Sequence, residues 1–372
     1  MGQPLFQPYD LSGTTLSNRI AMAPLTRRRA ENAALAADEM VALYYQQRAS
    51  AGLLIAEGSQ ISPQAYGYTG SPGCFTPRQL EGWKIVTRAV HNAGGKIFLQ
   101  LWHVGPFSHR LLQPGGKAPV SASPVNPEGE VLTSEGRLPY ESSRAMSREE
   151  ILQTVQDFAT AAQNAIKAGF DGVEVHGAHA YVIDQFILDG TNQRTDEFGG
   201  SKENRSKFLF MILDEILQSV PAAKVGLRLS PRSVKQGMED SSEKETYGYI
   251  IEKLNTYSLA YLHISEMMSQ DDRLEHPEKS IVPHYREIYK GTLISCGGHS
   301  LESASRMLTN NEADLIAFGK PYISNPDLVE RLKHNAPLAP WDKDTFYHGG
   351  RKGYIDYPAL SGIPHFTSLR SE

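Results

Sequence analysis

The sequence predicts a single (β/α)8 TIM barrel of the α/β class, and two observations favour this fold. Short apolar runs recur along the 372 residues, and stretches with helical periodicity separate them. The runs are apolar almost throughout, as strands buried on both faces of a parallel sheet should be. Because eight such strands alternate with helices, we expect a closed barrel and not an open sheet.

Each expected strand is a run of mainly aliphatic and aromatic residues. In chain order, these runs cover residues 20–24, 53–57, 96–102, 173–176, 225–230, 261–265, 293–296 and 315–318. Between them, apolar residues recur at helical spacing, most clearly over 149–168, 203–220 and 244–256. This order of strand, helix and strand is the one that repeated βα units produce.

One long segment, residues 103–146, interrupts the alternation after the third strand. It is rich in Gly, Pro and Ser, with Gln-Pro-Gly-Gly at 113–116 and Pro-Val-Asn-Pro at 124–127. A linker between two domains is the alternative, but the βα order resumes unchanged afterwards. We therefore expect one domain over 1–372, with 103–146 as a lid that caps the catalytic end of the barrel.

Composition narrows the class of protein. The formal net charge of -5 argues against nucleic acid or an anionic membrane as partner. The two cysteines, Cys74 and Cys296, give neither a disulfide framework nor a thiolate metal site. No secretory signal and no apolar run of about 18 residues is present. We expect a cytoplasmic enzyme with small-molecule partners, either a monomer or a homodimer.

The most informative stretch follows the fourth strand, where His176, His179 and Tyr181 lie within six residues. Two neutral imidazoles can donate N–H groups to a substrate carbonyl, and a phenol can protonate the carbon beside it. These steps reduce nothing without an electron source. A zinc pair is the other interpretation, but no Glu stands between the histidines as in His-Glu-x-x-His, and no third ligand is evident.

Polar residues and glycines lie late in most of the other strands or directly after them, at the end where the active sites of such barrels form. In chain order they are Thr26, Gly58, Gln100, Arg228, Gly297, Gly298, Gly319 and Lys320.

Several ordered motifs together resemble the Old Yellow Enzyme family of FMN-dependent ene-reductases. They are the segments 18–27, 100–103, 176–181, 192–200, 317–328 and 353–360. The His/His pair followed by Gly-Ala is most similar to the 12-oxophytodienoate reductase branch and its bacterial relatives. The resemblance implies a (β/α)8 barrel, non-covalently bound FMN and NADPH or NADH as reductant, with a lean toward NADPH.

The resemblance also implies which residues hold FMN. Thr26 would bond the flavin carbonyl near N5, Gln100 would meet the imide edge, and Arg228 would place a fixed charge by N1. The ring would be walled by Pro24, Leu25 and Gly58, with His176 on its open face. The phosphate would lie on backbone N–H groups. The phosphate residues are Gly297, Gly298, Gly319 and Lys320.

On the substrate side, the resemblance implies that His176 and His179 bind the oxygen of an α,β-unsaturated carbonyl compound. Hydride from flavin N5 would add to Cβ, and Tyr181 would protonate Cα. The aromatic walls of the pocket would be Tyr68, Trp102 and Tyr354. Enones, 12-oxophytodienoate-like oxylipins, nitroalkenes and quinones all suit such a pocket.

Two other functional classes stay open from the residues alone. One is a metal-dependent or cofactor-free barrel hydrolase or lyase that uses His176 and His179. The other is a non-catalytic flavin- or ligand-binding module, in which Tyr181 would have no purpose.

Two residues depart from the family pattern. Lys320 stands where Arg is usual, and lysine lacks the bidentate fork of arginine. Ala180 stands where Gly is usual, so a left-handed backbone there would be strained.

Overall fold

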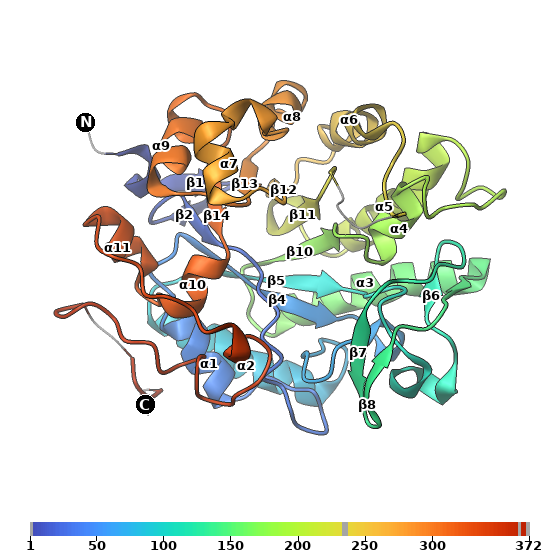
Figure 1. Cartoon of the computed structure of the whole chain (residues 1–372), viewed down its shortest axis with the longest axis horizontal. Helices are drawn as coiled ribbons and strands as arrows, with labels where there is room; N and C mark the ends of the chain where they lie inside the picture. Colours follow the sequence, from blue (N-terminus) through green and yellow to red (C-terminus); the bar gives the residue numbers. More distant parts are fainter. Residues whose placement is uncertain (1–2, 233–236, 364–365, 370–372) are drawn as a thin grey trace.

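The structure, a computed structural model that describes residues 3–232, 237–363 and 366–369, contains a closed barrel of eight parallel strands (Figure 1). The barrel confirms the predicted fold class. In the order in which they are hydrogen-bonded, its strands are β10 (Gly172–Gly177), β11 (Val225–Leu229), β12 (Tyr261–Ser265), β13 (Leu293–Cys296), β14 (Leu315–Phe318), β3 (Ile20–Met22), β4 (Leu53–Gln60) and β5 (Ile97–Trp102).

Helices connect consecutive strands and lie outside the barrel (Figure 1). The longer ones are α1 (Glu39–Gln46), α2 (Pro77–Asn92), α3 (Arg148–Lys167), α5 (Lys202–Leu217), α6 (Glu243–Leu254) and α9 (Leu301–Thr309). Shorter helices are α4 (Val182–Ile187), α7 (Gln270–Glu275), α8 (Val282–Ile288), α10 (Lys320–Ser324) and α11 (Leu328–Lys333).

Helix α3 shows why these segments fold locally. Ser147 accepts a hydrogen bond from the backbone N–H of Glu150, and the Glu150 side chain returns one, which forms a capping box. Ile151, Val155 and Phe158 then recur at helical spacing and are buried. The cap fixes where the helix begins, and the apolar stripe determines which face packs on the barrel.

The barrel interior is closed by apolar side chains at its amino-terminal end. Strands β1 (Tyr9–Leu11) and β2 (Thr14–Leu16) form a hairpin there, and Leu11 and Leu16 join the cluster that includes Leu53, Phe98 and Tyr261 from the barrel strands. The Tyr9 hydroxyl lies 2.8 Å from the hydroxyl of Thr292, just before β13. A site inside the barrel is therefore open only at the carboxyl end of the strands.

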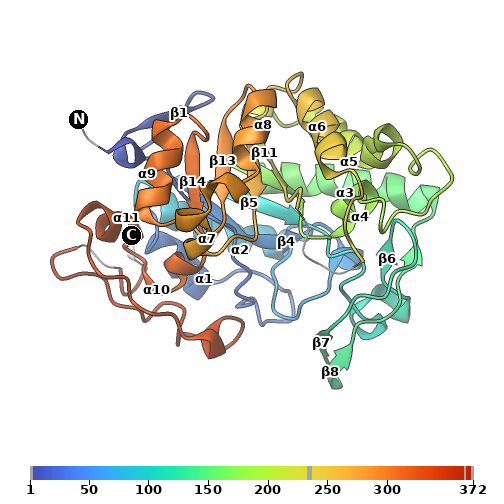
Figure 2. The ribbon, with the colours of Figure 1, turned by 45° about the horizontal axis from the view of Figure 1, so that its top comes forward.

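Residues 103–146 leave the barrel after β5 and return at α3. Strand β6 (Val120–Ser121) pairs with β9 (Arg144–Ala145), and β7 (Glu130–Thr133) pairs with β8 (Gly136–Pro139) as an antiparallel hairpin. Figure 2 shows this hairpin projecting from the body of the molecule. Whether the segment acts as a lid stays a prediction.

Candidate active site

The structure brings His176, His179 and Tyr181 together at the carboxyl end of β10. The ring centre of His176 lies 5.4 Å from that of His179 and 5.1 Å from that of Tyr181, and both pairs are nearly perpendicular. Trp102, the last residue of β5, packs edge-on against Tyr181 at 5.0 Å. The three predicted catalytic side chains thus share one small space.

A strained turn delivers Tyr181 to this space. His179 and Ala180 both have left-handed backbones, with φ of 59° and 60°. Asp184 holds the turn: one carboxylate oxygen accepts from the Ala180 N–H at 2.7 Å, and the other accepts from the Tyr247 hydroxyl at 2.6 Å. Ala180 therefore occupies a conformation that favours glycine, at a cost of about 1–2 kcal/mol.

Burial keeps the Tyr181 phenol protonated. Removal from water raises its pKa well above the ordinary tyrosine value, and the hydrogen bond with Tyr68 offsets only part of that rise. The Tyr68 ring stacks on Trp102 at 5.4 Å, and the Tyr140 hydroxyl donates to the Tyr68 oxygen at 3.2 Å. Tyr181 can therefore act as an acid at neutral pH.

A cavity of about 320 Å³ opens beside these aromatic rings. It brings Thr26, Tyr68, Trp102 and Tyr181 to one wall, so four of the predicted site residues line it together. Its full lining is Thr26, Arg28, Tyr68, Trp102, Glu130, Val131, Leu132, Arg137, Tyr181 and Tyr347.

Tyr354, predicted as an aromatic wall of the substrate pocket, does not line this cavity. Tyr354 is fully buried, and its ring stacks on Tyr44 with centres 4.1 Å apart. The guanidinium groups of Arg27 and Arg29 lie over the same ring at 5.2 and 4.9 Å. Tyr354 therefore packs the C-terminal segment against α1 and the loop after β3. From the same segment, Tyr347 is the aromatic residue that lines the cavity.

Arg228 offers a buried donor that fits the edge of an FMN ring. Arg228 stands opposite His176 in the β10–β11 register, and its Nη2 donates to the Ser265 hydroxyl at 3.1 Å. Its Nε is buried and has no hydrogen-bond partner among the described residues. A buried donor left unpaired costs about 1–3 kcal/mol, and an acceptor edge on the cofactor would relieve that cost.

His179 is linked to the same group of residues. Its Nε2 lies 3.0 Å from the Ser265 oxygen, which also accepts from Arg228. The side chain predicted to bind substrate and the side chain predicted to bind flavin thus share one hydroxyl.

The remaining predicted ring contacts lie at neighbouring strand ends. Pro24 and Leu25 are partly exposed after β3, and a Cβ built on Gly319 would lie 3.6 Å from Leu25. Gly58 faces Trp102 closely, because a Cβ there would come within 2.7 Å of the indole. The requirement for glycine at 58 is therefore set by Trp102.

The four residues predicted to hold phosphate follow the adjacent strands β13 and β14. Gly297 and Gly298 have φ of 128° and 63°, values that suit glycine. A Cβ on Gly298 would lie 2.5 Å from the Met268 oxygen, so the segment after β12 packs on this turn. Lys320 is exposed.

Sequence reasoning assigned no role to several residues that the structure brings to the site. Glu174 and His263 form a fully buried pair inside the barrel, with Oε2 of Glu174 2.8 Å from Nδ1 of His263. A charged residue in the otherwise apolar strand Val-Glu-Val was the available signal. Arg28, Arg137 and Tyr347 carry no comparable signal, because they come from loops and from the hairpin.

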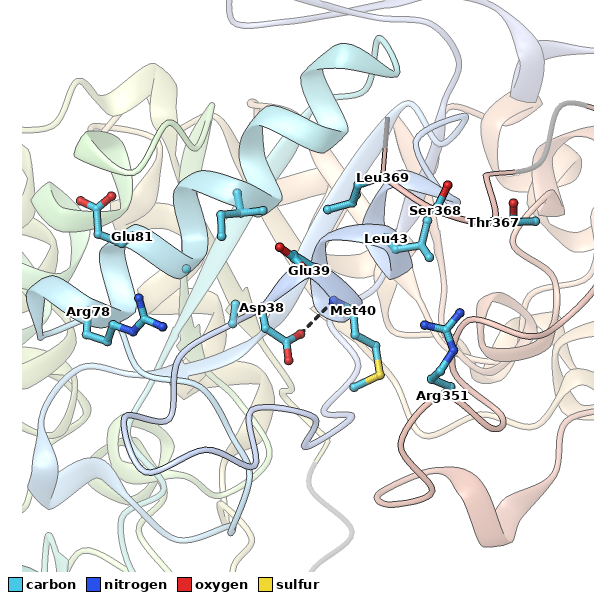
Figure 3. Close-up of a pocket in the computed structure, with 13 residues that line it drawn as sticks. Asp38, Glu39, Met40, Leu43, Arg78, Glu81, Arg351, Thr367, Ser368 and Leu369 are labelled. Atoms are coloured by element: carbon cyan, nitrogen blue, oxygen red, sulfur yellow. Dashed lines mark hydrogen bonds between the residues drawn. The ribbon is translucent and has the colours of Figure 1, made fainter. Parts of the chain in front are cut away.

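A larger groove, of about 880 Å³, lies outside the barrel between α1, α2 and the C-terminal segment (Figure 3). Its charged lining includes Asp38, Glu39, Arg78 and Arg351. It shares no residue with the predicted site.

Within the described residues, no three His, Cys, Asp or Glu side chains gather in a way that could hold a metal ion. Over the same ranges, every helix is too short or too polar to cross a membrane.

Comparison with known proteins agrees with this geometry. The model of the NADH:flavin oxidoreductase / NADH oxidase family matches residues 4–339. The chain is 40% identical to 12-oxophytodienoate reductase 1 of Oryza sativa subsp. japonica, over 97% of this chain and 94% of that protein. It is also 40% identical to 12-oxophytodienoate reductase 2 of Arabidopsis thaliana, over 96% of each.

Solved structures are similar throughout. Morphinone reductase in complex with tetrahydroNAD matches with a TM-score of 0.90 and 42% identity, over 97% of this chain and 98% of that one. The Old Yellow Enzyme homologue from Zymomonas mobilis gives 0.90 and 38%, over 96% and 99%. The alternative of a metal-dependent or cofactor-free hydrolase or lyase finds no support among these relatives. The chain belongs to the NADH:flavin oxidoreductase / NADH oxidase family, the family of Old Yellow Enzyme, whose cofactor is FMN.

Proposed function

We propose that this protein reduces the C=C bond of α,β-unsaturated carbonyl compounds. The observation that carries the proposal is the convergence of three side chains at the carboxyl end of the barrel: the ring of His176 lies 5.4 Å from that of His179 and 5.1 Å from that of Tyr181. Two imidazoles and a protonated phenol are the groups that carbonyl polarisation and carbon protonation need.

The roles of the side chains follow from their chemistry. When bound and reduced by a nicotinamide nucleotide, FMN would supply the hydride for Cβ. His176 and His179 donate N–H groups to the carbonyl oxygen and so draw electron density from Cβ. Tyr181 gives its phenolic proton to Cα. Arg228 and Gln100 bind the edge of the ring, while Trp102 and Tyr68 exclude water from the cavity.

The names of the relatives indicate the substrate class. 12-Oxophytodienoate and morphinone are both cyclic enones, and relatives named for these compounds match nearly the whole chain. We propose a cyclic enone here too, because the cavity is flanked by Tyr68, Trp102 and Tyr347, whose flat rings suit a ring compound.

We propose NADPH as the preferred reductant. Arg28 and Arg137 line both the 320 Å³ cavity and a second one of about 540 Å³, so both cavities share these two cations. Burial lowers the pKa of Arg28, and the nearby charge of Arg137 lowers it further. Two cations that repel each other beside a cavity favour an anion, such as the extra phosphate of NADPH.

Arg137→Gln tests the choice of nucleotide. We expect KM for NADPH to rise about tenfold, the effect of one charge-assisted contact, with a smaller change for NADH. Arg110→Gln is the matched control. Arg110 also lies in residues 103–146, but it is exposed and forms an ion pair with Glu141. Equal changes for both nucleotides would contradict recognition of the extra phosphate.

We also infer that residues 103–146 act as a lid. Glu130, Val131, Leu132 and Arg137 of the hairpin line the same cavity as Tyr181 and Trp102. Movement of the hairpin would therefore open or close the space in which the substrate lies. We propose a cytoplasmic location as well: Cys74 and Cys296 are both free thiols, which suits a reducing compartment.

Isotope mapping tests the reaction. The FMN-loaded protein is given a cyclic enone with deuterated nicotinamide in one reaction, and with ordinary nicotinamide in D2O in another. We expect the nicotinamide deuterium at Cβ and the solvent deuterium at Cα. An allylic alcohol as product, or nicotinamide deuterium at Cα, would overturn the proposal.

A further inference from the structure

A charged layer lies inside the barrel between the apolar closure and the predicted site. Its centre is Glu174 of β10, which is fully buried. One of its oxygens accepts from Gln100 Nε2 at 2.8 Å, and the other lies 2.8 Å from Nδ1 of His263 on β12. Glu174 therefore joins a predicted flavin contact to a histidine with no assigned role.

Glu174 and His263 each shift the pKa of the other. Burial alone would raise the pKa of Glu174, but His263, the charge of Arg228 and the hydrogen bond from Gln100 together hold the pKa below its ordinary value. Burial alone would lower the pKa of His263, and Glu174 raises it above its ordinary value instead. Both shifts favour the ionised carboxylate of Glu174, held by the ring of His263.

A carboxylate fixes the orientation of the Gln100 amide. An ionised carboxylate accepts hydrogen bonds and donates none, so Gln100 must turn its NH2 group toward Glu174. The amide carbonyl oxygen is then the group that Gln100 has left for the cofactor. A neutral, donating partner at position 174 would allow the opposite orientation.

We propose that Glu174, paired with His263, is a positioning residue that makes Gln100 an acceptor for the N3–H group of the flavin. This proposal rests on FMN binding and on the predicted contact of Gln100. The imide edge of the flavin offers one N–H donor between two carbonyl groups, so an acceptor facing N3–H is favourable and a donor facing it is repelled. Glu174 touches neither substrate nor cofactor in this account.

The flavin itself gives the test, because loss of the N3 proton at alkaline pH changes its absorbance. An acceptor that faces N3–H holds that proton, so we expect the bound FMN of the native protein to titrate above free FMN. In Glu174→Gln, Gln100 is free to turn, and we expect the titration to move down by about one pH unit, a tenfold change in the equilibrium. A purely structural role of Glu174 would not move it.

Asp327→Asn is the matched control. Asp327 is also a buried carboxylate in an ion pair, 2.8 Å from Arg331, but it belongs to the start of α11 outside the barrel. Its loss should leave the flavin titration at the native pH. A native titration in Glu174→Gln, or an equal shift in Asp327→Asn, would overturn the proposal.

A double-mutant cycle with Gln100→Ala tests whether Glu174 acts through Gln100. FMN dissociation is followed by the fluorescence released when the FMN-loaded protein is diluted. We expect Glu174→Gln to weaken binding about tenfold in the native background and hardly at all in Gln100→Ala. Additive effects would refute the coupling. If Glu174→Gln does not fold, Glu174→Asp, which withdraws the carboxylate by one methylene, replaces it in the same cycle.

The outcome also separates this proposal from the proposed function. If every variant holds FMN and reduces enones but the titration does not move, the positioning role alone fails. If the native protein takes up no FMN, the proposed function fails with it.

Discussion

Replacing Tyr181 with phenylalanine is the sharpest test of the predicted acid. The ring stays, so its edge-on contacts with Trp102 at 5.0 Å and His176 at 5.1 Å persist, and only the hydroxyl is lost. General acid catalysis contributes about 10²- to 10⁴-fold to a rate. Tyr68, hydrogen-bonded to Tyr181, offers a second buried phenol nearby, so we place the expected loss at the lower end, about 100-fold.

The magnitude separates catalysis from stability. A 100-fold loss corresponds to about 2.7 kcal/mol in the activation free energy. The deleted hydroxyl also removes a buried hydrogen bond, worth about 1 kcal/mol of folding free energy. Urea unfolding measures the second quantity independently, so a slow variant that has merely unfolded is recognised.

Rapid mixing resolves the two half-reactions. We expect reduction of the flavin by NADPH to keep its native rate, since no proton reaches carbon in that step, while reoxidation by an enone slows about 100-fold. Tyr140→Phe is the control: it removes a hydroxyl that bonds Tyr68 at 3.2 Å but leaves the three predicted catalytic side chains intact. Equal slowing of both half-reactions in Tyr181→Phe, or none in either, would refute the assignment.

Further predictions concern the cavity wall, the strained turn and acid stability. Tyr347→Ala should raise KM for an enone several-fold and Tyr354→Phe should not, because Tyr347 lines the cavity and Tyr354 does not. Steady-state kinetics that show the reverse would contradict the placement of these two tyrosines. Ala180→Gly should change the free energy of unfolding by less than about 1 kcal/mol, since relief of about 1–2 kcal/mol is offset by a lost methyl and a more flexible unfolded chain. Ala180→Val, β-branched at φ 60°, should be strongly destabilised in the same urea experiment, and native stability would show that the turn can change shape. Hydrogen bonds from Arg144 lower the pKa of Glu150 to about 2, so the stability from this pair is complete above the ordinary glutamate pKa and lost as the pH falls through about 2. Arg144→Gln should therefore unfold at higher pH than the native protein when acid is followed by circular dichroism; an unchanged midpoint would contradict it.

The barrel was predictable because burial on both faces leaves a simple pattern in the sequence. Only the ends of the strands differ from expectation. Strand β4 extends to Gln60 where 53–57 was expected, since Ser59 and Gln60 are polar and yet buried. An apolar pattern cannot reveal a strand end built from buried polar residues.

The three catalytic candidates were predictable because one turn carries them all. Tyr354 does not line the cavity, because its motif packs against the rest of the chain. A Cβ on Gly353 would lie 1.9 Å from the Thr345 hydroxyl oxygen, so the chain passes Thr345 too closely for a side chain there. That motif marks a structural turn, and the aromatic residue of the cavity, Tyr347, lies before it.

The buried pair of Glu174 and His263 indicates that the interior of this barrel does more than stabilise the fold. Both side chains are fully buried, and taking a carboxylate out of water costs several kcal/mol that its partners must offset. Nearby strands fill the same interior with Leu53, Phe98 and Ile294 at no such cost. A buried ion pair is weak evidence for stability, since apolar residues of similar volume often serve as well. Its position beside Gln100, under the group of side chains that fits FMN, is what an orienting role requires.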